Sequence, residues 1–215
     1  MISRGKSADR GDALLYRRTR IVGQMVDLSH SHVLDYGCGN GAQTDTIAPM
    51  CETLDAVDID GVYVRYDGKR LPYDNAVFNA VTSFQVLEHV EDEALSLDEI
   101  YRVLRFDGAL ILTVPNKWWI FDQHGAIHRI PFASWLPHFI HKRIAVARIY
   151  TVASITRLLR NHGFFVEKTL YLTAPMDRAR PTWLQTFLRA TMFKHDTTRI
   201  PLLATEIVVY ARRTK

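Results

Sequence analysis

Three glycines at alternate positions, preceded by a carboxylate, form the pattern in this chain that most clearly indicates a binding site. An apolar run ends at Asp35, and the glycines that follow it are Gly37, Gly39 and Gly41. A helix-compatible stretch comes next, so the glycines occupy a turn from strand to helix. Because these residues carry no side chain, the spacing predicts that a ligand lies directly against their backbone N–H groups.

A second carboxylate, Asp58, ends the strand that we predict over 53–58. A Rossmann-type site carries an acid about twenty residues beyond its glycines, where it accepts hydrogen bonds from ribose hydroxyls. Asp58 stands at that distance from Gly37. The alternative is a turn residue, because 58–61 reads Asp-Ile-Asp-Gly. Position and residue type together favour the ribose interpretation.

Three motifs resemble those of class I S-adenosylmethionine-dependent methyltransferases. The glycine pattern over 35–41 resembles the family's first motif, and Leu-Pro-Tyr follows Asp67 as such a tripeptide commonly does in the family. The stretch 78–90, which ends in Val-Leu-Glu-His-Val, is similar to the family's fourth strand and the turn after it. The resemblance covers residues 30–115 by motif, and 150–173 and 204–213 by pattern alone.

The resemblance implies S-adenosylmethionine as the cofactor and assigns roles to particular residues. Asp67 would contact the adenine amino group, although Asp67 and Gly68 also read as an ordinary turn. Phe84 and Gln85 would close over the methionine part. The predicted cofactor-binding residues are Asp35, Gly37, Gly39, Gly41, Asp58, Asp67, Gly68, Phe84 and Gln85.

The elements that must position these residues alternate between helical and strand patterns. Periodicity predicts helices over 13–28, 92–104, 152–161 and 182–193, and strands over 53–58, 109–114, 164–173 and 204–212. We expect the arginines of the first helix to form a solvated face, and Asp107-Gly108 to end the second helix. The resemblance implies an α/β, Rossmann-like three-layer sandwich, whose seven-stranded, mostly parallel sheet has one antiparallel strand.

The connection between the second and third strands is unusually short. If 62–66 is a strand, only three residues separate it from Asp58. A parallel crossover normally needs a dozen or more residues, usually with a helix. Either that helix is missing in this chain, or 62–66 is an extended loop.

We predict one domain over 1–215, with a cofactor-binding half over 12–114. Two insertions, 115–150 and 175–203, are expected to form the acceptor pocket or a lid. The first is rich in aromatic residues and histidines and is too long for an ordinary connection. Long loops at the carboxyl end of a strand usually carry substrate recognition.

Three histidines are candidate general bases. His124 and His128 lie in the first insertion, and His89 lies in the Val-Leu-Glu-His-Val motif. For each of them a structural histidine is the preferred interpretation, and a base comes second. Spacing by four is typical of a metal pair on a helix, but Gly125 lies between His124 and His128 and no cysteine or acid cluster accompanies them. We therefore predict no metal.

Composition limits the class of protein. The chain has 215 residues, 47% of them hydrophobic, and its net charge of +4 is too small to indicate nucleic acid as a partner. Its two cysteines form no disulfide framework, which predicts a cytoplasmic setting. Residues 1–12 contain no apolar signal region, and no apolar run approaches the ~20 residues of a bilayer span.

The implied reaction is methyl transfer from the cofactor's sulfonium to a small-molecule, sugar or lipid-linked acceptor. We expect O-methylation first and C-methylation second. No Pro-Pro-aromatic or Pro-Cys sequence points to amino-group or cytosine C5 methylation. Two alternatives remain: an RNA methyltransferase that uses the basic residues of 142–160 and 178–199, or a non-catalytic protein that keeps the cofactor fold. The glycine spacing disfavours a dehydrogenase.

The predicted helix 182–193 has a wide apolar face that includes Trp183 and Phe187. Basic residues lie in it and around it: Arg178, Arg180, Arg189, Lys194 and Arg199. This arrangement is typical of helices that contact anionic membrane surfaces. The simpler interpretation, which we prefer from sequence alone, is that the helix packs on the domain or on a second subunit.

Overall fold

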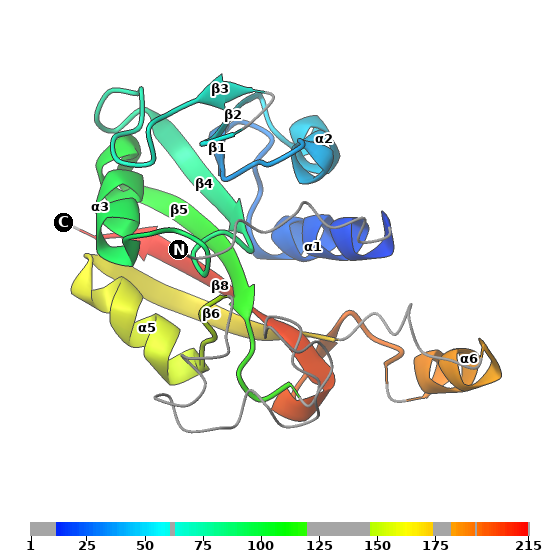
Figure 1. Ribbon diagram of the computed structural model, residues 1–215. Helices are drawn as coiled ribbons and strands as arrows, with labels where there is room; N and C mark the ends of the chain where they lie inside the picture. The colour runs from blue at the N-terminus through cyan, green and yellow to red at the C-terminus, as the bar shows by residue number, and fades with distance from the viewer. Residues whose placement is uncertain (1–11, 61–62, 120–146, 174–181, 192, 215) are drawn as a thin grey trace.

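The protein is a layered α/β structure, which a computed structural model describes for residues 12–60, 63–119, 147–173, 182–191 and 193–214 (Figure 1). The strands are β1 (His32–Tyr36), β2 (Thr53–Asp58), β3 (Val64–Arg65), β4 (Phe78–Phe84), β5 (Leu104–Pro115), β6 (Phe164–Thr173), β7 (Thr197–Thr198) and β8 (Ala204–Arg213). The helices are α1 (Asp12–Met25), α2 (Ala42–Ile47), η1 (Ala48–Met50), α3 (Glu93–Val103), α5 (Val152–Asn161), α6 (Thr182–Ala190) and η3 (Pro201–Leu203).

The strands form one sheet in the order β3-β2-β1-β4-β5-β8-β6-β7. The first five strands in this order are parallel, and β8 runs antiparallel to both of its neighbours. The predicted mostly parallel, Rossmann-like sheet is therefore confirmed. The predicted count of seven strands with one antiparallel is corrected to eight in the described residues, because the two threonines of β7 pair antiparallel with the end of β6.

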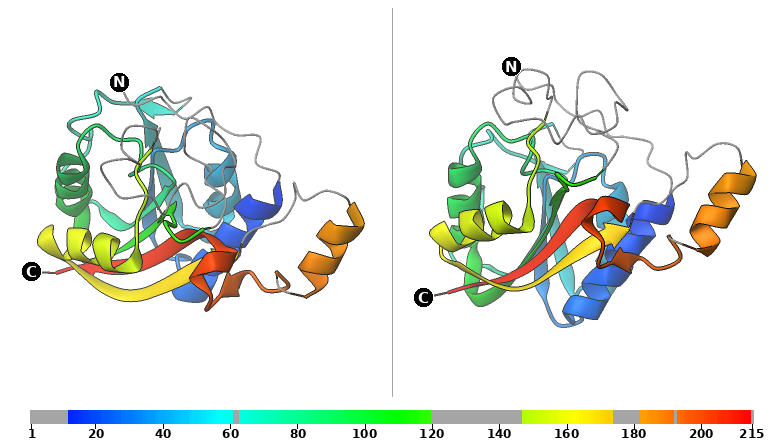
Figure 2. Two further views of the ribbon diagram at one scale, coloured as in Figure 1. Left: turned by 60° about the horizontal axis from the view of Figure 1, so that its bottom comes forward. Right: turned by 90° about the horizontal axis from the view of Figure 1, so that it is seen from below.

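Helices cover both faces of the sheet, as Figures 1 and 2 show. One hydrophobic core contains Leu97 and Ile100 of α3 and Ile155 and Leu159 of α5. The other packs α1 and α2 through Leu14, Ile21, Val22 and Ile47. Along β5, Leu110 and Leu112 face the first core while Ala109 and Ile111 face the second. This alternation matches the period of two residues in a strand and confirms the three-layer sandwich.

The short connection before β3 was predicted correctly, whereas the predicted end of the helix before β5 was not. Five residues separate β2 from β3, so the shortened connection is confirmed and leaves no room for a helix. The stop at Asp107-Gly108 is wrong, because α3 already ends at Val103 and β5 begins at Leu104. Asp107 has φ 60 and lies where the register between β4 and β5 shifts, so Asp107-Gly108 is an irregularity inside the strand.

Two of the three arginines of α1, Arg17 and Arg18, do not belong to the solvated face that we predicted, whereas Arg20 is exposed. Arg18 is 6% exposed and donates two hydrogen bonds to Glu206 of β8, from Nε at 3.0 Å and from Nη2 at 2.5 Å. Arg17 and Arg20 pair with Asp196, at 3.3 Å and 2.9 Å. The first helix is thus fastened to the C-terminal part of the sheet by charge as well as by apolar packing.

Asp35 connects α2 to the sheet through hydrogen bonds of its side chain. Its side chain is buried at the end of β1, where it accepts hydrogen bonds from the hydroxyls of Thr44 in α2, at 2.6 Å, and Thr82 in β4, at 3.1 Å. Burial raises the pKa of Asp35 to about 6. One carboxyl therefore links three elements directly beneath the glycine turn.

We predict that the Arg18–Glu206 pair contributes strongly to stability. Arg18→Met leaves Glu206, which is 2% exposed, without its bidentate partner, and should lower the free energy of unfolding by about 3–5 kcal/mol. Arg18→Met combined with Glu206→Leu should recover most of that loss. Arg20→Met is the control, since Arg20 is 58% exposed and its pair should be worth less than about 1 kcal/mol. Urea denaturation measures all three, and equal losses for Arg18 and Arg20 would contradict the assignment.

We also predict that the stability of the protein depends on pH through Asp35, and that Asp35→Asn removes this dependence. The pKa of Asp35 is raised from 3.8 to about 6, so the folded state holds this proton more tightly than the unfolded state. The stability of the wild type should therefore fall by about 3 kcal/mol relative to the Asn variant as the pH rises from about 4 to about 6. Urea denaturation of both proteins at several pH values measures this difference. Parallel curves across that range would disprove it.

Candidate functional site

The glycine turn between β1 and α2 uses its backbone donors internally. Gly37 N–H and Cys38 N–H both donate to Val57 O, at 2.8 Å and 3.2 Å, and Gly41 N–H donates to Cys38 O at 2.9 Å. Gly39 N–H donates to the Asp58 carboxylate at 2.8 Å. The N–H groups against which we expect a ligand to lie therefore already donate to acceptors of the protein.

The glycines are needed for backbone shape and close approach. All three have positive φ, 78° at Gly37, 56° at Gly39 and 83° at Gly41, which residues with side chains rarely adopt. A Cβ at Gly37 would lie 2.3 Å from the Val86 side chain, and one at Gly41 would lie 2.6 Å from the Tyr63 ring. A Cβ at Gly39 would meet nothing within 4 Å. A ligand can thus approach the turn most closely at Gly39.

Asp58 lies beside that open position. Its two carboxylate oxygens accept from Gly39 N–H and from Asp60 N–H, at 2.8 Å and 3.0 Å. Each carboxylate oxygen has further accepting capacity, so these bonds leave room for a hydroxyl donor. Asp58 therefore accepts hydrogen bonds from turn residues, as the alternative interpretation predicted. Its half-buried carboxylate also lies beside Gly39.

Asp67 and Gly68 form the turn that sequence offered as the alternative to adenine binding. The Asp67 carboxylate accepts from the N–H groups of Lys69 and Arg70, at 2.8 Å and 3.0 Å, and these bonds hold the pKa of Asp67 below its usual value. Gly68 has φ 79. The side chain of Asp67 is exposed, so it remains accessible to a ligand in this conformation.

A salt bridge on α3 fixes the loop that follows Asp67. Glu99 pairs with Arg102 at 2.7 Å and accepts from Leu71 N–H at 2.8 Å. Arg102 in turn donates to Leu71 O and to Tyr73 O, at 3.1 Å and 2.7 Å. The Leu-Pro-Tyr motif is thus anchored to α3, with Leu71 buried in the core.

Phe84 and Gln85 end β4 on the ligand side of the sheet. The guanidinium of Arg18 lies 5.9 Å from the centre of the Phe84 ring, so the ring rests against α1. Gln85 has φ 58, a strained conformation for a residue with a side chain. Its Oε1 is buried, and among the described residues no donor lies within hydrogen-bond distance of it. A bound ligand with an N–H or O–H group would satisfy that oxygen.

The remaining predicted residues are Asp35 and the three candidate histidines. Asp35 is enclosed beneath the turn, bonded to Thr44 and Thr82, so its carboxylate supports the site from the protein side. His89 lies in the turn after β4, where its N–H donates to Val86 O at 2.8 Å, and its ring is half-buried. His124 and His128 lie outside the described residues.

The described ends of the first insertion lie side by side at the carboxyl end of β5. Lys117 N–H donates to Tyr150 O at 2.8 Å, and Tyr150 N–H donates to Pro115 O at 3.0 Å. The side chain of Arg148 donates to Val90 O at 2.6 Å and pairs with Glu93 at 3.3 Å. The insertion is therefore rooted next to the turn that follows β4.

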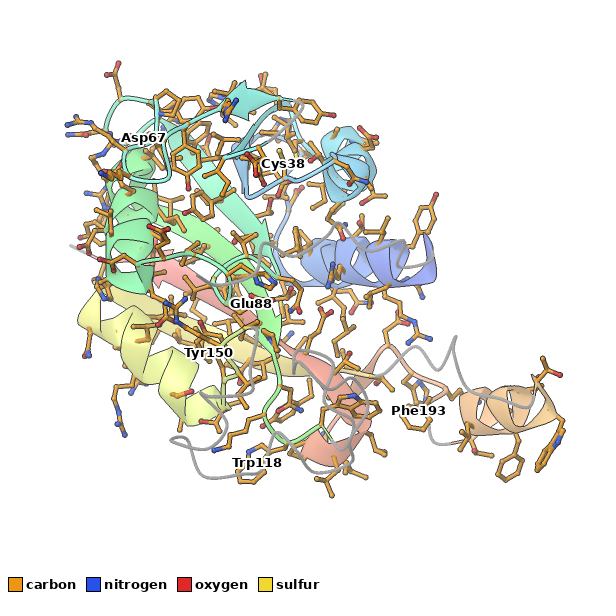
Figure 3. The ribbon with its side chains drawn as sticks, in the orientation of Figure 1. Cys38, Asp67, Glu88, Trp118, Tyr150 and Phe193 are labelled. Atoms are coloured by element: carbon orange, nitrogen blue, oxygen red, sulfur yellow. The ribbon has the colours of Figure 1, made fainter. Side chains whose placement is uncertain are left out.

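Glu88 and Tyr150 are residues at this edge to which the sequence assigned no role. Glu88 is buried in the turn after β4, and Tyr150 donates to Glu93 at 2.5 Å (Figure 3). Burial and the carboxylates of Glu93 and Glu88 raise the pKa of Tyr150. The signal for Glu88 was its place in Val-Leu-Glu-His-Val, whereas nothing in the sequence pairs Tyr150 with that motif.

The described residues contain neither a candidate metal centre nor a helix that could span a membrane. No group of three His, Cys, Asp or Glu side chains among them is arranged to hold a metal ion. None of the helices that they form is long and apolar enough to cross a bilayer.

Comparison with known proteins gives relatives of one kind. A "probable S-adenosylmethionine-dependent methyltransferase" of Mycolicibacterium smegmatis is 31% identical over 172 residues, which cover 72% of this chain and 61% of that protein. A ubiquinone biosynthesis O-methyltransferase of Xylella fastidiosa is 27% identical over 118 residues, covering 46% of this chain and 48% of that protein. The chain thus spans about half the length of the curated relatives it matches.

Solved structures share the fold. The 1,6-didemethyltoxoflavin-N1-methyltransferase of Burkholderia thailandensis, solved with 1,6-didemethyltoxoflavin and S-adenosylhomocysteine, superposes with a TM-score of 0.62 at 18% identity. The superposition covers 95% of this chain and 80% of that one. A family model described as a methyltransferase domain matches residues 10–169. The chain belongs to the class I S-adenosylmethionine-dependent methyltransferases.

Proposed function

We propose that this chain binds S-adenosylmethionine at the carboxyl ends of β1 and β2 and transfers its methyl group to an acceptor hydroxyl. The observation that carries the proposal is the 2.8 Å bond between Gly39 N–H and the Asp58 carboxylate. It sets an accepting group beside the one glycine of the turn at which added atoms would meet open space. A ribose with two hydroxyls suits that pair, because a carboxylate accepts charge-assisted hydrogen bonds from both.

The other residues of the site fit the remaining parts of the cofactor. Asp67 and Gly68 would face the adenine, and Phe84 would cover the methionine part. The buried Oε1 of Gln85 would accept from the amino group of the methionine part. Asp35 would position the turn from beneath, since both of its oxygens already accept from threonine hydroxyls.

The cofactor supplies a methyl group activated by its sulfonium, so the chain's own contribution is alignment and exclusion of water. The buried core beneath β4 and β5 holds the turn after β4 rigidly at this edge. The ends of the first insertion, tied together through Lys117 and Tyr150, bring that segment to the same edge. An acceptor bound there would lie next to the methyl group.

The acceptor that we propose is a hydrophobic or ring-bearing molecule, free or linked to a lipid. The relative from Xylella fastidiosa is named an O-methyltransferase of ubiquinone biosynthesis, which supports transfer to oxygen. Trp118 in the first insertion is exposed, and the neighbouring Trp119 packs on Phe193 of the second insertion, so aromatic side chains gather at this edge. Aromatic and apolar surfaces typically line pockets for such acceptors.

An RNA acceptor finds less support among the described residues. Arg148, one of the basic residues on which that alternative depended, already pairs with Glu93 and donates to three backbone carbonyls of the turn after β4. A guanidinium held in this way has few donors left for phosphate. The cofactor-binding fold without catalysis is the second alternative, and the methyl-transfer assay below separates it from the proposal.

We place the protein in a reducing, cytoplasmic setting. Cys38 and Cys51 are both free thiols, and burial raises the pKa of Cys38 to about 12 and that of Cys51 to about 11. Thiols held in the protonated form at neutral pH are poor nucleophiles for disulfide exchange. This supports a chain that functions without disulfides.

Calorimetric titration with S-adenosylmethionine tests the cofactor site. Asp58→Ala should weaken binding by roughly 1.5–3 kcal/mol, or about 10- to 160-fold, because it removes charge-assisted hydrogen bonds to the ribose. Asp58→Asn keeps an acceptor for Gly39 N–H and should lose less. Asp55→Asn, three residues earlier on the same strand and bonded to His32, serves as the control. Unchanged affinity in Asp58→Ala, or tighter binding of NADH, would overturn the proposal.

A methyl-transfer assay on quinol, sugar and lipid-linked acceptors tests the chemistry and the candidate bases. If His124 or His128 takes the acceptor proton, replacing that residue by Ala should lower kcat by about 10²–10⁴-fold with cofactor affinity unchanged. His89→Ala is tested in the same way. His30→Ala is the control, since His30 is exposed just before β1, at the opposite edge of the sheet. Normal turnover in all the variants would exclude a histidine base.

A further inference from the structure

Helix α6 carries two aromatic side chains that the rest of the described structure leaves in solvent. Trp183 is 69% exposed and Phe187 is 59% exposed. Residues four apart on a helix share a face, so the two rings form one apolar surface. Figures 1 and 2 show α6 standing beside the layered body of the protein in every view. The preferred sequence interpretation, in which the helix buries this face on the domain, does not hold for these two side chains.

The helix is nevertheless anchored to the body on another side. Leu188 packs with Trp119, Phe193 and Leu203, and Figure 3 places Phe193 between α6 and the rest of the protein. Phe193 N–H donates to Leu188 O at 2.9 Å, which closes the end of the helix. The aromatic surface is thus held outward by contacts that do not involve it.

The charge around this surface is positive. Residues 182–203 contain three basic residues, Arg189, Lys194 and Arg199, and one acid, Asp196. Asp196 is already neutralised by Arg17 and Arg20 of α1, at 3.3 Å and 2.9 Å. Lys194 and Arg199 are exposed, as are the apolar side chains of Ile200 and Leu202. Exposed aromatic rings on a helix that is followed along the chain by exposed basic residues are complementary to an anionic lipid surface.

The segment that carries α6 leaves the sheet at the edge that holds the site. It joins Thr173, at the end of β6, to Ala204, at the start of β8, and these two residues pair with each other. Two residues along β8, Glu206 pairs with Pro115 at the carboxyl end of β5. Asn116 also donates from its side chain to Pro201 O and Ala204 O, at 2.7 Å and 2.8 Å. The base of this segment therefore adjoins the root of the first insertion.

We propose that α6 binds the surface of an anionic lipid bilayer through Trp183 and Phe187, with Lys194 and Arg199 contacting the headgroups. The bilayer then faces the edge of the sheet at which the acceptor enters. Resting on the function proposed above, this selects lipid-embedded molecules as the class of acceptor. The membrane contact itself depends only on the surface of α6.

Flotation of the full chain with vesicles tests the contact. With equimolar phosphatidylglycerol and phosphatidylcholine, we expect wild-type protein to float at low salt, and to float at least about fivefold less at ~0.5 M NaCl or on pure phosphatidylcholine. Trp183→Glu with Phe187→Glu should abolish flotation. Trp183→Phe, which keeps an aromatic ring, should preserve it. Lys194→Glu with Arg199→Glu should weaken it on anionic vesicles.

A matched pair of aromatic residues provides the control. Phe106 and Phe165 are 61% and 56% exposed and lie near the amino ends of β5 and β6, at the opposite edge of the sheet. Phe106→Glu with Phe165→Glu introduces the same charge at equally exposed positions and should leave flotation unchanged. Circular dichroism and thermal melting of each variant establish that it is folded.

Three results would overturn the proposal. The first is a folded wild type that never floats. The second is equal loss of flotation in both double variants, and the third is unfolding caused by Trp183→Glu with Phe187→Glu, which would mark α6 as core. Sedimentation equilibrium detects the competing case, in which a second copy covers α6 and the same variant breaks a dimer. Calorimetry with S-adenosylmethionine is run on every variant, so failure of the cofactor site is recognised separately from failure of the membrane contact.

Discussion

The shape of the site depends on a single requirement, that the backbone donors of the turn after β1 find acceptors at the edge of the sheet. The carbonyl of Val57 accepts two of these donors, and the carboxylate of Asp58 accepts the donor of Gly39. The end of β2 therefore defines the turn that follows β1. Asp35 holds the start of α2 from beneath. Among the three glycines of the turn, Gly39 is the one at which an added Cβ would meet nothing within 4 Å.

Many of the helices and strands were predictable because their bounds follow from the local periodicity of apolar residues. Runs of apolar residues gave β2 and β6 with their exact bounds and β8 to within one residue, and helical spacing gave the bounds of α5. Prediction failed where a local signal has two meanings. Asp107-Gly108 resembles a helix stop, but the same residues suit an irregularity within a strand, and pairing of β5 with β4 decides between them. The two-residue strand β7 gave no periodic signal at all.

The sequence predicted the place of Asp58 at the end of β2, and the structure puts its carboxylate beside Gly39 of the glycine turn. A residue's contacts were not predictable where the partner is remote. Spacing along α1 cannot distinguish the buried Arg18 from the exposed Arg20, because the difference is made by Glu206, far along the chain in β8. The same holds for Tyr150, whose contact with Glu93 depends on how the first insertion returns to the sheet. Local sequence thus predicts the bounds of many elements, whereas the partners of Arg18 and Tyr150 are specified by long-range contacts.

The helices that cover the sheet limit the directions from which an acceptor can approach the proposed cofactor site. The cofactor half is closed on both faces of the sheet by helices, so the carboxyl edge of the strands is the direction left for approach. Both insertions are rooted at that edge, one through Lys117 and Tyr150 and the other through Asn116 and Ala204. Trp119 from the first packs on Phe193 from the second, so the two roots behave as one apolar unit. The aromatic surface of α6 is therefore connected, through Phe193 and Trp119, to the edge of the sheet at which we propose that the acceptor binds.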